Sequence, residues 1–303
     1  MPRENHFTVT SKKDLFRKRL SRLGNFRRIP FTTSLKILFF YLKKRIKAST
    51  SENENLLNYY FLTLINCDCY SNKIDDVYFY FRNNRNIQFV ARKNGSSDLE
   101  VFNQVWGRKE YEKSCELLKN NNETQRQYNI IDAGGNAGYT ALYFNDCFPG
   151  AKIVSIEPDE DNYEILQRNI RMNNIKNIIP LKFGLWDKTI NLKVDRNYGD
   201  GREWGIRVLE TNEDTGLQGI SLPDLLKRYQ IEQIDLLKID IEGAETKVFN
   251  NKEHVREFLS ITKILAIEIH DESISRNFVY GILKENNFLY FNFSDLTIAY
   301  KSR

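Results

Sequence analysis

Two hydrophobic patterns alternate along the chain from residue 128 onward. Continuous apolar runs are typical of strands buried on both faces, and apolar residues spaced three or four positions apart are typical of helices. Together these patterns predict an α/β fold, in which helices cover both faces of a mostly parallel, seven-stranded sheet. The predicted strands are 129–133, 152–156, 178–183, 234–239, 264–269, 289–293 and 296–300.

The chain before residue 128 has a different pattern. Two runs rich in aromatic and β-branched residues flank Asn83 and Asn84, which predicts a β-hairpin over 77–91. Helices are predicted at 34–48, with Ser34 as N-cap, and at 56–64, 99–105 and 111–120; residues 49–55 read as a linker.

These patterns divide the chain into two parts. Residues 1–75 are predicted to form a basic arm with helices; this arm and the hairpin that follows it make an N-terminal helical and β-hairpin extension to the main fold. Residues 76–303 form the main domain, with the hairpin and a lead-in at 76–127 and the catalytic core at 128–303.

Charge is distributed unevenly. Residues 1–48 contain 14 Lys or Arg and 2 Asp or Glu, although the whole chain has a formal net charge of only +5. The predicted helix 34–48 combines an apolar stripe with flanking lysines, so it could rest on anionic lipid as a peripheral membrane contact. The alternative is a basic helix that packs this stripe on the domain. The stripe consists of Leu35, Leu38, Leu42 and Ile46.

The cysteines and apolar runs indicate a cytoplasmic protein. Cys67, Cys69, Cys115 and Cys147 do not complete a zinc-binding pattern, so free thiols are expected. The longest apolar run of the arm, 37–42, is too short to span a bilayer and too internal for a secretory signal.

The first candidate site is a glycine turn between the strand 129–133 and the next helix. Such a turn brings backbone N–H groups to a helix N-terminus and lets a nucleotide-like ligand approach closely. Asp132 lies inside it, where it would repel a pyrophosphate but suit the cationic cofactor S-adenosylmethionine. The expected cofactor-binding residues here are Asp132, Gly134, Asn136 and Gly138. A plain strand-to-helix turn is the alternative.

The ends of the next two predicted strands carry further candidates. Glu157 could accept hydrogen bonds from both ribose hydroxyls, or cap a helix instead. Leu185 and Trp186 could sandwich an adenine ring, with Asp187 accepting a hydrogen bond from its amine; the alternative for Trp186 is a core position.

The last two parallel strands end in residues suited to proton transfer. Asp240, Glu242 and His270 are the candidate catalytic residues, with His270 as the leading base and Asp240 as the alternative. These three could also bind a divalent cation, although no metal site is assigned. Glu245 is interpreted as an acid that favours the N-terminus of its helix.

A polar insert at 189–219 interrupts the alternation of strands and helices, with a short strand predicted at 190–194 and a polar loop at 196–203. It is expected to cover the carboxyl edge of the sheet and to select the acceptor, unless it is a solvated loop. Its candidate contacts are Arg202, Trp204 and Arg207, of which the arginines suit a carboxylate or phosphate.

In this order, the motifs resemble the FkbM family of S-adenosylmethionine-dependent methyltransferases. The loop 132–138 resembles the family form D-x-G-A-N-x-G, and 156–158 and 238–243 match its later motifs. Residues 95–111 resemble its lead-in segment. The likeness covers about 87–295, so the arm at 1–75 receives no function from it.

The resemblance implies a Rossmann-like, class I methyltransferase fold and O-methylation of a hydroxyl on a sugar, glycan or natural product. It implies that the 132–138 loop lines the methionine part of the cofactor, that Glu157 holds the ribose and that Asp240 lies near the transferred methyl group. Two other functions remain open: a nicotinamide oxidoreductase, disfavoured by Asp132, and a nucleic-acid protein using the basic arm. The sequence lacks the Asn-Pro-Pro-Tyr or Asp-Pro-Pro-Tyr signature of amino-methyltransferases, so nucleic acid is not an expected partner.

Overall fold

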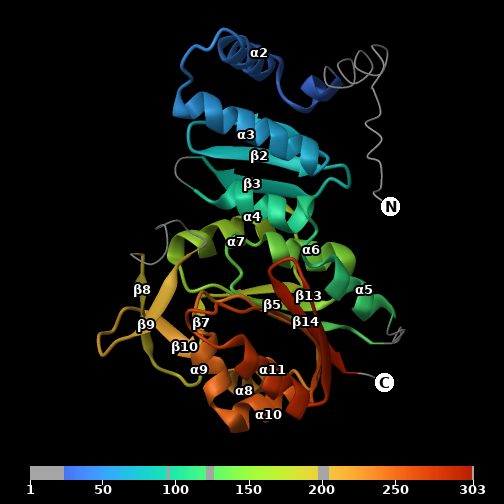
Figure 1. Ribbon diagram of the computed structural model, residues 1–303, viewed down its shortest axis with the longest axis vertical. Coiled ribbons are helices and arrows are strands. Elements are labelled where there is room, and N and C mark those ends of the chain that lie inside the picture. The colour runs from blue at the N-terminus through green and yellow to red at the C-terminus, as the bar shows by residue number, and fades with distance from the viewer. Residues whose placement is uncertain (1–23, 94–95, 121–125, 197–204, 302–303) are drawn as a thin grey trace, which may run out of the picture. The chain divides into compact units, whose positions relative to one another are not determined.

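The computed structural model describes residues 24–93, 96–120, 126–196 and 205–301. The chain forms two compact units, Met1–Ile87 and Gln88–Arg303 (Figure 1). The units therefore divide twelve residues after the boundary expected at 75/76, because the strand that follows residue 76 packs with the N-terminal helices. Residues 1–23 of the predicted arm lie outside the described residues.

The first unit contains helices and an antiparallel strand pair. Its aromatic core includes Tyr60, which is fully buried and stacks on Phe79 with ring centroids 4.0 Å apart. The described elements are η1 (Asn25–Arg28), α2 (Phe31–Arg45), α3 (Glu52–Asn66), β1 (Cys69–Ile74) and β2 (Tyr78–Asn83).

Three local predictions in this region were wrong. Helix α2 begins at Phe31, and Ser34 lies inside it, where its hydroxyl donates to the Pro30 carbonyl at 3.2 Å. The supposed linker supplies the start of α3, because Ser51 and Glu54 form a capping box. Strand β1, which pairs with β2, was missed because its burial does not alternate cleanly.

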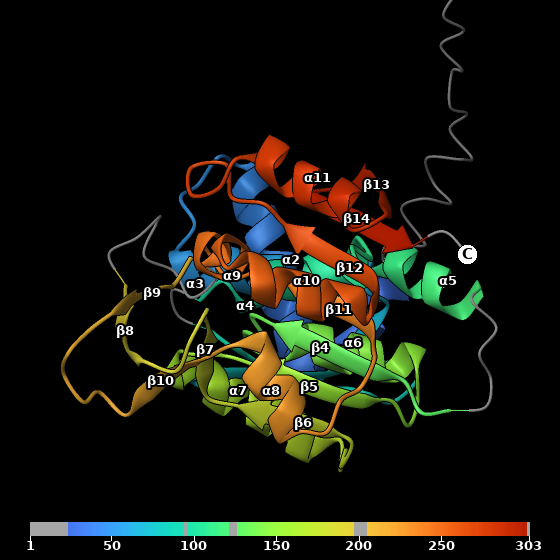
Figure 2. The same cartoon turned by 90° about the horizontal axis from the view of Figure 1, so that it is seen from below.

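The second unit contains the predicted seven-stranded sheet, in the order β13-β14-β12-β11-β4-β5-β6. Strands β12, β11, β4, β5 and β6 run parallel, and β14 pairs antiparallel with β12 and β13 (Figure 2). The α/β fold class is therefore confirmed. The strands are β4 (Asn129–Ala133), β5 (Lys152–Ile156), β6 (Ile178–Leu181), β11 (Ile234–Ile239), β12 (Thr262–Glu268), β13 (Phe288–Phe293) and β14 (Leu296–Lys301).

Helices cover both faces of this sheet. Figure 1 shows α6 and α7 on one side and α8 and α10 on the other. The central strands are apolar on both faces, and a core of β4, β11 and β12 side chains meets α8 to α11. The helices are α4 (Asp98–Phe102), α5 (Glu112–Asn120), α6 (Tyr139–Cys147), α7 (Glu160–Met172), α8 (Leu222–Arg228), α9 (Glu245–Asn250), α10 (Lys252–Ser260) and α11 (Arg276–Glu285), with the π-helical turn η2 (Asn103–Gly107) after α4.

The insert builds a second, four-stranded sheet in the order β7-β10-β8-β9. The predicted strand 178–183 is split, because β6 joins the large sheet while β7 pairs in parallel with β10 in the small one. The strands are β7 (Phe183–Leu185), β8 (Asn191–Asp195), β9 (Arg207–Glu210) and β10 (Leu217–Ile220).

Cys67, Cys69, Cys115 and Cys147, all among the described residues, are thiols with no disulfide between them. Among the helices that the structure describes, none has the length and apolar character required to cross a membrane.

Candidate active site

The turn after β4 has a backbone that few residues can adopt. Gly134, Asn136 and Gly138 all have positive φ, at 84°, 45° and 85°. A Cβ on Gly134 would lie 1.7 Å from the Asp240 carbonyl oxygen, so this position needs glycine on two grounds. Asn136 is one of the non-glycine residues that tolerate the left-handed region. The turn therefore holds β4 and β11 close together at their carboxyl ends.

The role expected of Asp132 needs correction. Asp132 is fully buried and is not among the described residues that line the cavity, so its charge does not meet a ligand directly. Its carboxylate accepts a hydrogen bond from Ser155 Oγ at 2.8 Å and lies 3.5 Å from Lys238 Nζ. Asp132 is thus neutralised inside the protein.

Lys238, on the adjacent strand β11, connects this strand to the glycine turn after β4. It is 1% exposed, donates to the Gly134 carbonyl at 2.6 Å and lies 3.6 Å from the Asp240 carboxylate. Burial lowers the pKa of Lys238, but the charges of Asp240 and Asp132 outweigh burial and raise it. The sequence analysis missed this role, although a lysine inside an apolar strand is an available signal, because a buried charge needs a partner.

Glu157 lies at the end of β5 and faces the same cavity. Its carboxylate accepts the Asn136 N–H at 2.7 Å and the Asp159 N–H at 3.0 Å, so it also fixes the glycine turn. Burial raises the pKa of Glu157 to about 7. The predicted position at the ligand site is consistent with this geometry, because each carboxylate oxygen can accept more than one hydrogen bond.

These elements surround a cavity of about 550 Å³ at the carboxyl edge of the large sheet. Its volume is within the usual range for small-molecule sites. Gly134, Asn136 and Glu157 form one part of its lining, with apolar contacts from Ile156, Leu185 and Ile206. A site with a close-approach glycine, an acid able to accept from a ribose and apolar walls fits S-adenosylmethionine.

The proposed adenine contacts are only partly consistent with this cavity. Leu185 lines it, but Trp186 and Asp187 are not among the described lining residues. Successive side chains of an extended segment point in opposite directions, and Trp186 packs with Leu192, Val208 and Leu217 in the small sheet. Its indole N–H donates to Glu210 at 3.2 Å. The core interpretation of Trp186 therefore replaces the adenine-stacking one.

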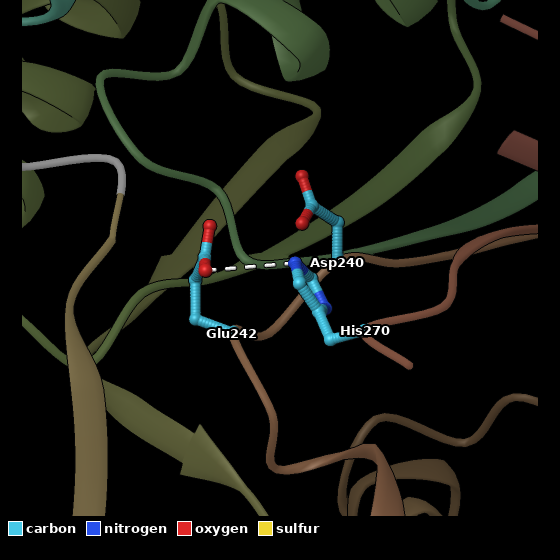
Figure 3. Close-up of side chains that lie close together, drawn as sticks. All are labelled: Asp240, Glu242 and His270. Carbon is cyan, nitrogen blue, oxygen red and sulfur yellow. Dashed lines mark ion pairs between the residues drawn. The ribbon is translucent and has the colours of Figure 1, made fainter. Parts of the chain in front are cut away.

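Asp240, Glu242 and His270 converge at another part of the cavity wall (Figure 3). One potential ligand atom from each lies within 4.8 Å of the others. His270 Nε2 lies 3.5 Å from Glu242 Oε2, and its Nδ1 lies 3.0 Å from Glu245 Oε1. Glu242 has a φ of 51°, an uncommon backbone for glutamate. The sequence placed Asp240 and His270 at the ends of their strands but did not show that the three residues converge; the structure brings them together.

Glu245 does more than favour a helix N-terminus, which was its expected role. It is fully buried, and Oε1 accepts the Ile241 N–H at 3.3 Å in addition to contacting His270 Nδ1. A carboxylate on Nδ1 favours the tautomer in which Nδ1 carries a proton, and it orients Nε2 toward Glu242. Glu245 is therefore a positioning residue for His270.

The wall around this group is acidic. Burial, followed by the charge of Asp240, raises the pKa of Glu242 to about 8 and that of Glu268 to about 8. The same causes raise the pKa of Glu110 to about 7. Glu110 and Glu268 line the cavity and were missed by the sequence analysis. Only the fold reveals Glu110, which precedes α5 and is far from this edge in sequence, whereas Glu268 ends β12 two residues before His270 and could have been found there.

The pKa of His270 is affected by opposing causes. Burial lowers its pKa, but the hydrogen bond and charge of Glu245 and the charges of Asp240 and Glu242 outweigh burial and raise the pKa to about 10. The imidazole is therefore protonated near neutral pH. This argues against the imidazole alone as the proton acceptor and gives Glu242 a cationic neighbour. A neutral His270 with Asp240 and Glu242 could instead bind a divalent cation.

The insert contributes to the cavity through Gly205, Ile206 and Val208. Arg207 points elsewhere: its guanidinium donates to Ser273 Oγ at 3.0 Å and to the Glu242 carbonyl at 3.4 Å. It therefore fixes the loop that carries Glu242, instead of reaching a free acceptor as expected. Arg202 and Trp204 lie outside the described residues.

Comparison with known proteins identifies the family of this chain. The methyltransferase FkbM domain matches residues 132–290, which is more than half of the chain. Methyltransferase sdnD of Sordaria araneosa is 25% identical over 190 residues, covering 52% of this chain and 73% of that protein. Methyltransferase 1 of Beauveria bassiana is 26% identical over 144 residues, covering 39% of this chain and 56% of that protein.

Among solved structures, an S-adenosylmethionine-dependent methyltransferase from Agrobacterium tumefaciens is a distant likeness, with 9% identity and a TM-score of 0.43. It covers 77% of this chain and 72% of that one. The family match contains the glycine turn, Glu157 and the Asp240–His270 edge within one domain. The chain therefore belongs to the FkbM family of S-adenosylmethionine-dependent methyltransferases.

Proposed function

We propose that this methyltransferase acts on a hydroxyl oxygen of a sugar, glycan or natural product, and that the Glu242–His270 pair accepts the hydroxyl proton. The observation that carries the proposal is the 3.5 Å contact of this pair in the cavity that also holds Gly134 and Glu157. A hydroxyl is a weak nucleophile until it loses its proton, so O-methylation benefits from a base in the same cavity.

The residues divide into two groups by role. S-adenosylmethionine supplies an electrophilic methyl group when it is bound. Gly134, Asn136 and Glu157 would hold it, the first two along its methionine part and Glu157 at its ribose. Asp132 contributes indirectly, because its pairing with Lys238 keeps the loop carbonyl of Gly134 fixed.

Proton acceptance belongs to the second group. The ionised form of Glu242 takes the proton, and the imidazolium of His270, oriented by Glu245, limits the rise of the Glu242 pKa that the acidic neighbours cause. Without that positive charge, the charges of Asp240 and Glu245 would raise the Glu242 pKa further. The pair therefore acts as one unit, and its two titrations are coupled.

The acidic wall also favours a class of acceptor. Glu110, Asp240, Glu242 and Glu268 would repel a carboxylate or phosphate placed beside them. A neutral, hydroxyl-bearing acceptor avoids this repulsion and can donate hydrogen bonds to the same groups.

The proposal is tested by incubating the protein with labelled S-adenosylmethionine and separate fractions of neutral glycans, acidic glycans and small natural products. We expect a labelled methyl ether from a neutral fraction. Label found only on nitrogen or sulfur, or only on an anionic acceptor, would contradict the proposal.

A chelation experiment distinguishes proton acceptance by Glu242 and His270 from activation of the hydroxyl by a metal ion. If Asp240, Glu242 and His270 held a divalent cation, that cation would activate the hydroxyl in place of the base. We expect activity to persist after EDTA treatment and dialysis. Loss of activity that Mg²⁺ or Mn²⁺ restores would replace the Glu242–His270 base with a metal centre.

The rate should depend on pH through Glu242. Its pKa is raised to about 8, and the accepting form exists above that value, so kcat/KM for the acceptor should rise as pH increases through about 8. The measurement is initial methyl transfer between about pH 6 and pH 9, with a fluorescence check that the protein stays folded.

Glu242→Gln is the matched control for this profile. It should lose the rise with pH together with most of the rate, because glutamine is similar in size but cannot accept the proton. A Glu242→Gln profile that kept the wild-type midpoint would assign the titration to another group.

Cofactor affinity should depend on Glu157. Its carboxylate is the better hydrogen-bond acceptor when ionised, so affinity should fall as pH decreases below about 7. Glu157→Gln should weaken S-adenosylmethionine binding by about 10- to 150-fold, since a charge-assisted hydrogen bond contributes about 1.5–3 kcal/mol. Isothermal titration at about pH 6 and pH 8 measures both effects.

Glu160→Gln serves as the control, because Glu160 lies on the same segment but is exposed and pairs with Lys182. Its affinity should match the wild type. Equal affinities for wild type and Glu157→Gln at both pH values would remove Glu157 from the cofactor site.

A further inference from the structure

Helix α2 has two apolar faces. Its inward residues, Ile37 and Phe40, are buried in the first unit. A second row, spaced three or four positions apart and therefore on one side of the helix, is exposed to solvent. That outward stripe consists of Phe31, Leu35, Leu38, Leu42 and, just past the helix end, Ile46, which are 47–77% exposed.

Within the described part of the first unit, α2 packs only through its inward side. Leu35, Leu38 and Leu42 do not pack on that part of the chain. They are about half exposed, and Phe39 beside them is 55% exposed. A surface helix normally presents polar residues outward, so an outward row of this size marks a surface that contacts something apolar.

Basic residues accompany the outward stripe. Residues 24–48 contain seven Lys or Arg and no Asp or Glu. Arg28 pairs with Asp68 and Lys43 with Glu54 in the first unit. Four others are exposed on or just after α2: Lys36, Lys44, Arg45 and Lys47.

We infer that α2 docks the protein on an anionic lipid surface. An apolar row for the acyl boundary, with lysines and arginines for the headgroups, is the combination that holds an amphipathic helix in the plane of a membrane. Helix α2 has 15 residues, a length of about 22 Å, which suits lying on a bilayer better than crossing a core of about 30 Å.

A second copy of the chain is a poorer occupant of this surface. Two α2 stripes packed together would bring their basic residues close to each other, and the segment 24–48 offers no acidic residue to pair with them. Like charges of this density oppose association, whereas anionic headgroups are attracted to them. Membrane docking would deliver the catalytic unit to acceptors at a lipid surface.

The test is flotation of the full chain with vesicles of phosphatidylcholine alone or of equal parts phosphatidylcholine and phosphatidylserine. We expect binding to the anionic vesicles that weakens with added salt. Leu35→Gln/Leu42→Gln should reduce the partition coefficient by at least about tenfold, because glutamine keeps the helix propensity but removes the apolar contact. Lys36→Gln/Lys47→Gln should reduce it to a similar extent.

Val77→Gln is the matched control, because Val77 is 55% exposed in the same unit but lies outside α2. It should bind vesicles like the wild type. Circular dichroism and S-adenosylmethionine affinity should be unchanged in all variants, which separates loss of docking from loss of folding or of the methyl-donor site. Absence of vesicle binding, equal binding by the leucine variant, or a dimer that this variant dissociates would overturn the proposal.

Discussion

Replacing His270 with alanine is expected to lower kcat by about 10²–10⁴-fold, the usual contribution of a positioned proton-transfer group. The physical reason is electrostatic. His270 Nε2 lies 3.5 Å from the Glu242 carboxylate, and the charges of Asp240 and Glu245 raise the Glu242 pKa when this cation is removed. An even smaller fraction of Glu242 would then be ionised at neutral pH, where its pKa of about 8 already leaves most of it protonated. The measurement is single-turnover methyl transfer at saturating S-adenosylmethionine.

A double variant of Glu242 and His270 tests whether the two side chains act as one unit or contribute independently to the rate. If Glu242 and His270 act as a unit, Glu242→Gln/His270→Ala should lose about as much activity as either single variant. Losses that multiply would show that the two side chains act separately. Cofactor affinity should change little in all three, because the glycine turn and Glu157 hold the donor.

His254→Gln is the control for loss of a histidine. His254 lies on α10 and is not among the described residues that line the cavity. Its kcat should remain that of the wild type. Glu245→Gln provides a finer test of positioning: it preserves side-chain size but removes the charge on Nδ1, so it should lower the His270 pKa and shift the pH profile.

Lys238→Met is expected to destabilise the protein by about 3–5 kcal/mol, the range seen when one partner of a buried ion pair is removed. Asp132 is fully buried beside Lys238 Nζ, and the Gly134 carbonyl would lose its hydrogen-bond donor at the same time. Urea unfolding at neutral pH, followed by intrinsic fluorescence, measures the change in free energy of unfolding.

Two further variants test whether the loss of stability comes from the unpaired charge of Asp132. Asp132→Asn/Lys238→Met removes both charges and should recover part of the lost stability, because no uncompensated carboxylate remains. Lys193→Met, at an exposed position of β8, should change stability by less than about 0.5 kcal/mol. A loss below about 1 kcal/mol for Lys238→Met would show that Asp132 finds another partner or protonates without strain.

The sequence predicted most of the second unit well. The apolar runs at 129–133, 152–156 and 234–239 match β4, β5 and β11. Strands buried on both faces leave a continuous hydrophobic signal, so their position is visible without the fold. Helix α10 was missed, although Val255, Phe258 and Leu259 have helical spacing, because few apolar residues lie around them.

The sequence analysis was wrong for polar residues whose role depends on a side chain far away in the sequence. Asp132 was interpreted as a ligand contact because Lys238, its partner on the adjacent strand β11, is more than a hundred residues away in sequence and could not be placed beside it. Trp186 read as a cofactor contact because the small sheet that buries it was only partly predicted. Glu245 read as a helix-end acid because its contact with His270 joins residues 25 positions apart.

The sequence by itself determined the α/β fold and the glycine turn, because hydrophobic period and loop glycines are local properties, and the order of its motifs indicated the cofactor through the family resemblance. It also placed Asp240 and His270 at the same edge of the sheet, since parallel strands end together. Only the tertiary structure decided that Lys238 neutralises Asp132, that Glu245 orients His270 and that α2 presents its stripe of leucines to solvent. The physical reason is that the spacing of hydrophobic residues predicts which side of a helix or strand is apolar. What packs against that side depends on contacts between residues far apart in the sequence.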